Sequence, residues 1–357
     1  MSSVKDGHEG KDGQLGKRWS AFEASAPGRI CLFGEHQDYL GWPAVVMAID
    51  LRCRIRFTPR KDRLACWSSP ALGLSASYAL DALPSSVRPE GSASQGERND
   101  HLLAALIEGR VLGWSWPCGW DALIESDVPV QAGCSSSTAL ISAWTLALAR
   151  MADVELSPAA LVTAAHRAEV LHFDEAGGRM DHQAIAHGGL NRVHANGKVD
   201  PLTLEGLGNF LLGDSGVPKD TQAVLARCNT DRSGSNLSTA TAVNKAIEEE
   251  ASAKLSAGLS SPAERIALGK RMNEHHRMLS EHLEVSTEKI DGLCAAARAS
   301  DALGAKINGS GGGGCMFAWF QPEDQAALLA ASESMAEAGA VRTVQVRPDG
   351  GAVIKID

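Results

Sequence analysis

The chain has 357 residues, 44% of them hydrophobic, and a formal net charge of −9 at neutral pH. This length fits one large domain or two medium-sized ones, with enough apolar residues for a sizeable core. An acidic chain offers no broad basic surface to a nucleic-acid backbone, so the composition argues against a nucleic-acid partner. An anionic substrate would need a local cation or a metal ion.

We expect a cytoplasmic protein with no membrane-spanning segment and no membrane partner. No apolar run reaches about 18 residues, the length that a membrane helix needs. Residues 1–20 lack the apolar centre of a secretion signal and predict a flexible tail. The eight cysteines form no C-x-x-C pair, so we expect reduced thiols and neither zinc knuckles nor thioredoxin-type chemistry.

The first part of the chain alternates strand-like and helical patterns. Residues 29–33 and 44–59 are rich in β-branched and apolar residues, which predicts two strands. The polar stretch 83–100, rich in Gly, Ser and Pro, predicts a loop. Residues 100–113 have helical periodicity, and residues 118–129 have the pattern of a strand that leads into a turn.

Helices dominate the pattern farther along. One helix is expected from Ser136 to Met151, with an apolar face. The next is expected after Ser157, a favoured N-cap, with Pro158 at its first position. Residues 237–300 are predicted to be mostly helical, and residues 342–357 to form a strand hairpin with an Asp-Gly-Gly turn.

The order of these elements indicates the fold class. Strands and helices mix without regular βαβ alternation, so we expect an α+β fold rather than a doubly wound sheet. Turns rich in Gly, Asn and Asp cluster over residues 195–208, which places a boundary near residue 200. We therefore expect an N-terminal domain over residues 21–200 and a C-terminal domain over residues 201–357.

The stretch DVPVQAGCSSSTAL, residues 127–140, has the pattern of a phosphate-binding loop. A strand ends, a Gly/Ser loop follows and a helix begins, so N–H groups would face a bound anion. Ser135, Ser136 and Ser137 add hydroxyls that could bond phosphate or ligate Mg²⁺. The Walker A pattern is missing, and an ordinary serine-capped helix is an alternative.

A second glycine-rich loop lies in GAKINGSGGGGCMFAW, residues 304–319. Gly309 and the run 311–314 stand between two strand-like segments. Glycine permits positive φ and a close approach of the backbone to a ligand. A flexible linker is the alternative, although linkers are not usually flanked on both sides by apolar segments.

Two carboxylates follow the first of these loops. Glu169 lies near the end of the helix that begins at Pro158, and Asp181 follows twelve residues later, after a Gly-Gly turn. The pair suits one metal ligand and one catalytic group, although solvated carboxylates are far more common. His166, Glu169 and His172 also form H-x-x-E-x-x-H. These positions spread over about 200° of a helix, so the two histidines do not easily reach one zinc ion.

Polar side chains interrupt an apolar segment, SAPGRICLFGEHQDYLG, near the start of the chain. Arg29, Glu35, His36 and Asp38 offer the donors and acceptors that a polyol site needs. An unpaired buried hydroxyl costs roughly 1–3 kcal/mol, so such a site would discriminate well among substrates. The alternative is that Glu35 and Asp38 only cap a turn.

These motifs, taken together and in this order, resemble the GHMP kinase superfamily, named for galactokinase, homoserine kinase, mevalonate kinase and phosphomevalonate kinase. PVQAGCSSSTA is similar to the second family motif, P-x-G-x-G-L-x-S-S-A, with departures at Gln131 and Cys134. INGSGGGGCMF is similar to the third motif. The resemblance implies a two-domain GHMP kinase fold with mixed sheets and helices and an active site in the interdomain cleft.

Within the superfamily the chain looks most similar to galactokinase. The sugar signature of that family, G-R-x-N-x-I-G-E-H-T-D-Y-x-G-G, stands here as GRICLFGEHQDYLGW, with departures at Cys31, Gln37 and Trp42. Its Glu followed by G-I-M-D-Q is similar to Glu169 and GRMDHQ. Mevalonate kinases have Lys at the position of Arg29 and lack H-x-D-Y, yet SAPG, LFGEH and GWPAVVMAI resemble that family.

The resemblance implies a role for each matched residue. Asp181 would be the catalytic carboxylate, with Arg29 as its cationic neighbour. Ser137 and Glu169 would hold Mg²⁺. The implied sugar contacts are Glu35, His36, Asp38, Gly178 and Asp181, and the implied ATP contacts are Gly133, Ser135, Ser136, Ser137, Gly311 and Gly312.

The activity implied is ATP-dependent phosphorylation of a sugar, first of all at the anomeric C1 hydroxyl of galactose or a related monosaccharide, in a monomer or homodimer. Mevalonate kinase, or another GHMP small-molecule kinase, is the alternative. A sugar-sensing homologue without catalysis is an alternative of a different class. Galactokinases carry a sugar-contacting Tyr in the C-terminal half, and this chain has only Tyr39 and Tyr78, which leaves the identity of the sugar open.

Overall fold

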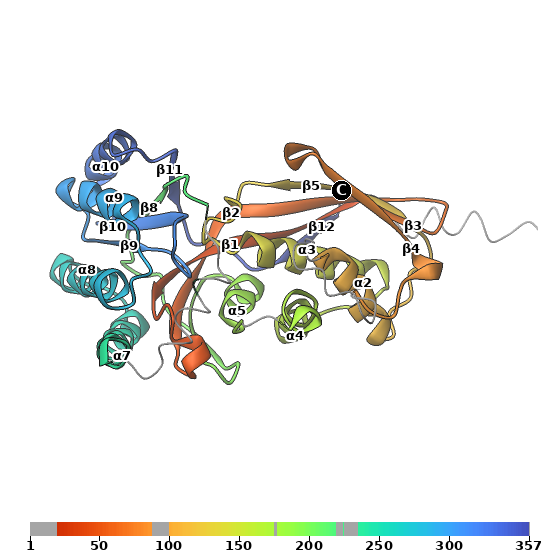
Figure 1. Cartoon of the computed structure of the whole chain (residues 1–357), viewed down its shortest axis with the longest axis horizontal. Helices are drawn as coiled ribbons and strands as arrows, with labels where there is room; N and C mark the ends of the chain where they lie inside the picture. Colours follow the sequence, from red (N-terminus) through yellow and green to blue (C-terminus); the bar gives the residue numbers. More distant parts are fainter. Residues whose placement is uncertain (1–19, 88–99, 175–176, 219–223, 225–234, 357) are drawn as a thin grey trace, which may run out of the picture.

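Two β-sheets with packed helices make up the structure, a computed structural model. One sheet has eight strands and the other has four, and they succeed each other along the long axis of the molecule (Figure 1). The α+β class expected from the sequence is confirmed. Nearly all of the predicted N-terminal tail lies outside the described residues, which are 20–87, 100–174, 177–218, 224 and 235–356.

The eight-stranded sheet is built around its two longest strands, β1 (Phe22–Phe33) and β2 (Ala44–Pro59). The two strands are antiparallel and pair along most of their length. Along β2, Cys53, Ile55 and Phe57 are buried while the arginines between them are half-buried or exposed. Successive side chains of a strand point to opposite faces, so this alternation places the apolar residues in the core.

Six shorter strands complete this sheet, in the order β12-β1-β2-β5-β3-β4, with β6 and β7 beside β2. They are β3 (Leu64–Ser69), β4 (Leu74–Ala79), β5 (Trp120–Ser126), β6 (Leu190–Val193), β7 (Val199–Pro201) and β12 (Val353–Ile356). Neighbours are antiparallel except β3 and β5, which are parallel. The strand predicted over residues 118–129 is confirmed as β5.

Helices cover one face of this sheet (Figure 1). They are α2 (His101–Val111), α3 (Ser136–Met151), α4 (Pro158–Glu169) and α5 (Met180–His187). On α3, Trp144 packs against Phe57 of β2 and Trp120 of β5, with ring centroids 5.2 and 6.3 Å apart. Ser157 accepts a hydrogen bond from the Ala160 N–H and caps α4. The helices predicted in these places are confirmed.

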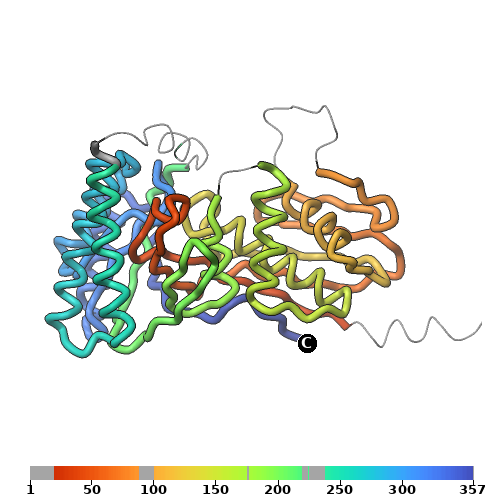
Figure 2. The backbone as a smooth tube through the Cα atoms, turned by 90° about the horizontal axis from the view of Figure 1, so that it is seen from below, coloured from red at the N-terminus to blue at the C-terminus, as the bar shows by residue number. Residues whose placement is uncertain are grey.

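The four-stranded sheet belongs to the second half of the chain. Its order is β11-β8-β10-β9, with β8 (Asn209–Asp214), β9 (Gly304–Ile307), β10 (Cys315–Phe320) and β11 (Arg342–Val346). The helices here are α7 (Ser235–Ala257), α8 (Pro262–Arg277), α9 (Glu288–Ala299) and α10 (Gln325–Glu337). Figure 2 shows α7 and α8 as neighbouring rods at one end of the molecule. The largely helical character predicted for residues 237–300 is confirmed.

The hairpin predicted over residues 342–357 is wrong. Strand β11 pairs with β8, whereas β12 pairs with β1 in the other sheet. The turn between them is held by Arg52 of β2, which donates to the Asp349 carboxylate at 2.6 Å and to the Gly351 carbonyl at 3.0 Å. These contacts with β2 hold the turn so that the chain passes from β11 in one sheet to β12 in the other. They cannot be predicted from the local turn sequence.

Two expectations drawn from composition can be compared with the described residues. None of their helices is both long and apolar enough to cross a bilayer. Seven cysteines are free thiols, mostly buried, as expected for reduced residues. Cys228 lies outside the described residues.

Candidate active site

An arginine and an aspartate from distant parts of the sequence form the centre of the site. Arg29 lies on β1, and Asp181 is the second residue of α5. The Arg29 Nε donates to Asp181 Oδ1 and Nη2 donates to Oδ2, both at 2.8 Å. Arg29 Nη1 donates to the carbonyl of Gly133, which lies in residues 127–140, here called the phosphate-loop segment. One guanidinium therefore joins β1, α5 and that loop.

This pairing fixes the charge of both groups. Burial alone would raise the pKa of Asp181, but the charge and hydrogen bonds of Arg29 lower it below its ordinary value. Burial would lower the pKa of Arg29, and Asp181 raises it instead. The Asp181 side chain remains 28% exposed. An ionised carboxylate thus reaches the surface of the site beside a permanent cation.

The phosphate-loop residues lie against this pair at the start of α3. Ser135, which precedes α3, has φ of 60° and makes no capping bond to that helix. Its hydroxyl donates to Asp181 Oδ2 at 2.5 Å, so an ordinary serine cap does not describe it. Ser136 is half-buried and Ser137 is exposed. The N-terminal turn of α3, whose first N–H groups have no partner within the helix, therefore begins next to Asp181, an arrangement suited to a phosphate.

Glu169 lies behind the same turn and is buried. Its Oε1 accepts a hydrogen bond from the Thr138 hydroxyl at 3.1 Å, and its Oε2 lies 2.9 Å from His182 Nε2. Burial would raise the pKa of Glu169, but His182 and the Ser137 hydroxyl lower it. The carboxylate and the two hydroxyls are oxygen donors of the kind that Mg²⁺ prefers.

The zinc pattern H-x-x-E-x-x-H does not assemble. His166 Nε2 lies 3.4 Å from the Gly177 carbonyl, while His172 Nε2 lies 3.3 Å from a carboxylate oxygen of Glu108. The described residues contain no group of three or more His, Cys, Asp or Glu able to hold a metal ion. A metal at Glu169 would need further ligands from phosphate or water.

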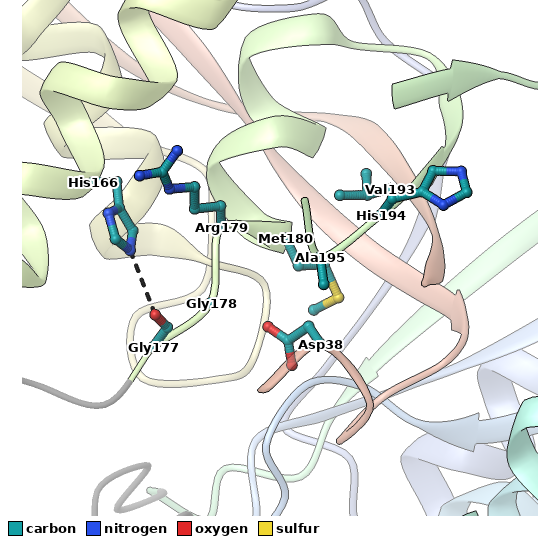
Figure 3. Close-up of a pocket in the computed structure, with 9 residues that line it drawn as sticks. All are labelled: Asp38, His166, Gly177, Gly178, Arg179, Met180, Val193, His194 and Ala195. Carbon is teal, nitrogen blue, oxygen red and sulfur yellow. Dashed lines mark hydrogen bonds between the residues drawn. The ribbon is translucent and has the colours of Figure 1, made fainter. Parts of the chain in front are cut away.

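A cavity of about 160 Å³ opens beside α5 (Figure 3). In the close-up the Asp38 carboxylate points toward the Gly177–Gly178 stretch, and Met180 and Ala195 lie beside it. A Cβ on Gly178 would stand 2.0 Å from Asp38 Oδ2, so any larger residue there would displace the Asp38 carboxylate. Burial, and then the nearby charge of Asp181, raise the pKa of Asp38. The residues that line the cavity are Asp38, His166, Gly177, Gly178, Arg179, Met180, Val193, His194 and Ala195.

Two predicted substrate contacts, Glu35 and His36, form bonds with the second half of the chain. Glu35 is buried and accepts a hydrogen bond from the ammonium group of Lys306 on β9. His36 has φ of 60°, and its Nε2 lies 3.0 Å from the carbonyl of Ser310. Neither side chain lines the cavity, whereas Asp38 and Gly178 do.

The glycine-rich stretch is an ordered loop rather than a flexible linker. All five glycines between 309 and 314 have positive φ. The Gly312 N–H donates to the Val285 carbonyl at 2.7 Å. Ahead of the loop, the amide of buried Asn308 donates to the Gly133 carbonyl at 2.9 Å and accepts from the Cys31 N–H at 3.0 Å. The loop that contains Gly311 and Gly312 is thereby tied to the phosphate-loop segment.

The sequence analysis missed Thr138, Lys306 and Asn308, and also the cavity-lining residues Arg179, Met180, Val193, His194 and Ala195. Lys306 directly precedes the third motif, and Asn308 is the second residue of that motif, in AKIN. A lysine and an asparagine within so apolar a segment are the signal that could have revealed them, since buried polar groups need partners.

Family models match three parts of the chain. They are described as the galactokinase galactose-binding signature over residues 14–59, the GHMP kinases N terminal domain over residues 101–189, and GHMP kinases C terminal over residues 264–336. The chain belongs to the GHMP kinase family. The two-domain GHMP kinase fold expected from the motifs is confirmed.

Curated relatives of this GHMP kinase are named mevalonate kinases. The protein from Thermococcus gammatolerans is 33% identical over 314 residues, which cover 86% of this chain and 91% of the relative. The protein from Pyrococcus abyssi is 30% identical, with 83% and 87% covered. The galactokinase branch expected from the signature is therefore supported less well than the superfamily.

Solved structures share the fold at lower identity. The mevalonate kinase of Methanococcus jannaschii superposes with a TM-score of 0.78 at 21% identity, covering 93% of this chain and all of that one. The Lactococcus lactis galactokinase complexed with galactose has a TM-score of 0.77 at 18% identity, with 96% and 98% covered. Both branches therefore have this architecture.

Proposed function

We propose that this GHMP kinase transfers the terminal phosphoryl group of ATP to an alcohol group of a small acceptor. The observation that carries the proposal is the bidentate Arg29–Asp181 pair beside Ser135, at the start of α3. The N-terminal turn of α3 would receive the phosphates, and Asp181 would orient the acceptor hydroxyl and take its proton. Arg29 would stabilise charge on the transferring group. Phosphoryl transfer needs mainly positioning and electrostatics, so a weak base suffices.

The acceptor we propose is mevalonate, which replaces galactose as the first candidate. The support comes from the curated relatives, which are named mevalonate kinases. The lining of the cavity suits such a molecule. Arg179 offers a cation for a carboxylate, Met180 and Val193 offer apolar surface, and Asp38 offers an acceptor for a hydroxyl.

A sugar is the second candidate, supported by one observation. The galactose-binding signature matches residues 14–59 and contains Asp38, which lines the cavity. A carboxylate in this position accepts hydrogen bonds from sugar hydroxyls as readily as from mevalonate. Glu35 and His36 would then mainly support the loop, because Glu35 Oε1 bonds to Lys306 and His36 Nε2 bonds to Ser310.

The test is release of ADP with a panel of mevalonate, galactose, arabinose and glucuronate. We expect turnover with mevalonate. Turnover with a sugar and none with mevalonate would establish the second candidate. Sugar binding without ADP release would instead identify a sensor and reject the kinase proposal.

Asp38→Ala should raise the acceptor KM about 5- to 150-fold, since one unpaired hydroxyl is worth roughly 1–3 kcal/mol. The ATP KM should stay near the wild-type value, because Asp38 faces the cavity lined by α5 and not the start of α3. Steady-state kinetics with each substrate varied in turn checks this. Equal KM values for the variant and the wild type would remove Asp38 from the acceptor site.

Mg²⁺ is proposed to bind at Glu169 with the hydroxyl of Ser137, the remaining ligands being phosphate and water. Oxygen donors are what this ion prefers, and the donors present fit it. When bound, Mg²⁺ neutralises phosphate charge. Glu169→Gln should raise the Mg²⁺ concentration for half-maximal rate at least about tenfold.

The matched control is Glu108→Gln, which alters a buried carboxylate paired with Arg167 on α4. We expect it to leave the Mg²⁺ titration of the rate unchanged. A Glu169→Gln variant with the wild-type Mg²⁺ titration would place the metal elsewhere.

A further inference from the structure

Lys306 on β9 is completely buried, at 0% exposure. Its ammonium donates to the Glu35 carboxylate, to the Cys31 carbonyl at 3.1 Å and to the Ile307 carbonyl at 2.8 Å. A lysine ammonium has three donors, so all of them are used. Lys306 therefore has no donor left for a substrate, and it does not line the cavity.

The Lys306–Glu35 pair joins the two halves of the chain at one point. Glu35 belongs to the segment 34–41 that follows β1, here called the acceptor loop, while β9 belongs to the four-stranded sheet. His275 Nε2 is 4.0 Å from Glu35, and burial holds the pKa of His275 well below its ordinary value. Lys306 is thus the cation that balances Glu35. Removing two charges from water is costly, so such a pair is weak evidence for stability alone.

Other contacts also fix the path of the acceptor loop. Gly34 enters it with φ of 98°, and a Cβ there would stand 2.7 Å from Ala44 Cα. His36 is tied to Ser310 of the glycine-rich loop. Asp38 begins a short 3-10 turn that ends at Leu40, and its carboxylate enters the cavity. The contact that holds Glu35 therefore lies three residues before the group that meets the acceptor.

The geometry points to Lys306 as a positioning residue that, through Glu35, holds the acceptor loop so that Asp38 faces the cavity. This inference rests on the proposed function in one respect, that the cavity receives the acceptor. A binding group that is displaced by about 1 Å can lower the rate by a factor on the order of 10². Loss of the pair should accordingly weaken acceptor binding while the phosphate loop, held by Arg29 and Asn308, keeps its affinity for ATP.

The experiment compares K306M with the double variant K306M/E35Q. K306M removes the ammonium group and leaves the buried charge of Glu35 without a partner. The double variant removes both charges, so the inference can still be tested with it if K306M does not fold. We expect the acceptor KM to rise about tenfold or more, with the ATP KM within about twofold of wild type. An unchanged acceptor KM in a folded double variant overturns the inference.

R265M is the matched control. Arg265 is also a buried cation of the second half of the chain, and it bonds to the Leu259 and Gly206 carbonyls. It should lower the melting temperature without changing the ratio of the two KM values. A ratio shifted equally by R265M would mean that general destabilisation moves it, and Lys306 would have no positioning role.

Hydrogen exchange of the full chain gives a readout that needs no substrate. In K306M/E35Q the amides of residues 34–41 should exchange faster, while those of β5 should not change. If the wild type phosphorylates no member of the panel, the proposed function fails, and this measurement still decides on Lys306. Unchanged exchange in the acceptor loop would refute the positioning role whatever the substrate is.

Discussion

Asp181→Asn should lower kcat by about 10²–10⁴-fold, the range for one acid–base group. The amide cannot take the acceptor proton, and it gives Arg29 one oxygen in place of the two that accept at 2.8 Å. The ATP KM should change little, because the phosphate contacts proposed for the start of α3 remain. Single-turnover measurement of phosphoryl transfer at saturating substrates checks the chemical step directly.

Asp349→Asn is the matched control for this substitution. Asp349 also pairs with an arginine, Arg52, and its side chain has the same exposed fraction as that of Asp181, 28%. Loss of an ion pair alone should lower stability in both variants, whereas only Asp181→Asn should lower kcat. A turnover number near wild type in Asp181→Asn would exclude Asp181 from the chemistry.

The charge state of Asp181 also sets the sign of its pH dependence. Its pKa is lowered in the folded protein by Arg29 and Ser135. The stabilisation that the carboxylate contributes is therefore present above its unfolded pKa, and is lost as the pH falls through the lower folded pKa. Asp181 therefore remains ionised at neutral pH. Lowering the pH from alkaline values to neutrality should not reduce its ability to act as a base.

The local motifs were predictable because each carries its own chemistry. The Gly/Ser loop before α3 and the carboxylate Asp181 could be identified one at a time. Their convergence was expected only from the resemblance to the GHMP kinases and not from local pattern, because the bond between Arg29 and Asp181 spans 152 residues. The Lys306–Glu35 bond spans 271 residues, and nothing in the local pattern around Glu35 distinguishes a partner on β9 from a sugar hydroxyl.

The last strand shows the same limit in the fold. The stretch after β11 has a good turn sequence, and a hairpin was the local prediction. The partners that decide its path are Arg52 and β1, both far away along the chain.

The identity of the acceptor is a further example of what local sequence pattern leaves undecided. The signature around Asp38 favours galactokinase, while identity over 86% of the chain favours mevalonate kinases.

The glycine-rich loop supports a second prediction of large effect, at Gly314. It has φ of 75°, and a Cβ there would stand 2.7 Å from the backbone carbon and oxygen of Ala132. The next residue, Cys315, donates its N–H to the Ala132 carbonyl at 2.8 Å. The glycine-rich loop and the phosphate-loop segment therefore touch backbone to backbone, and an added methyl group must push them apart.

Gly314→Ala should destabilise the protein by about 1–3 kcal/mol from the strained φ alone, and by more from the clash. It should also raise the ATP KM, because Ala132 precedes Gly133, whose carbonyl receives Arg29 and Asn308. Urea unfolding and ATP titration check the two effects separately.

Gly73→Ala distinguishes strain from collision. Gly73 also has a left-handed conformation, with φ of 63°, but nothing lies within 4 Å of a Cβ added there. This control should lose stability by roughly 1 kcal/mol and keep the wild-type ATP KM. If Gly314→Ala matches it in both quantities, the contact with Ala132 is not a constraint on the nucleotide site.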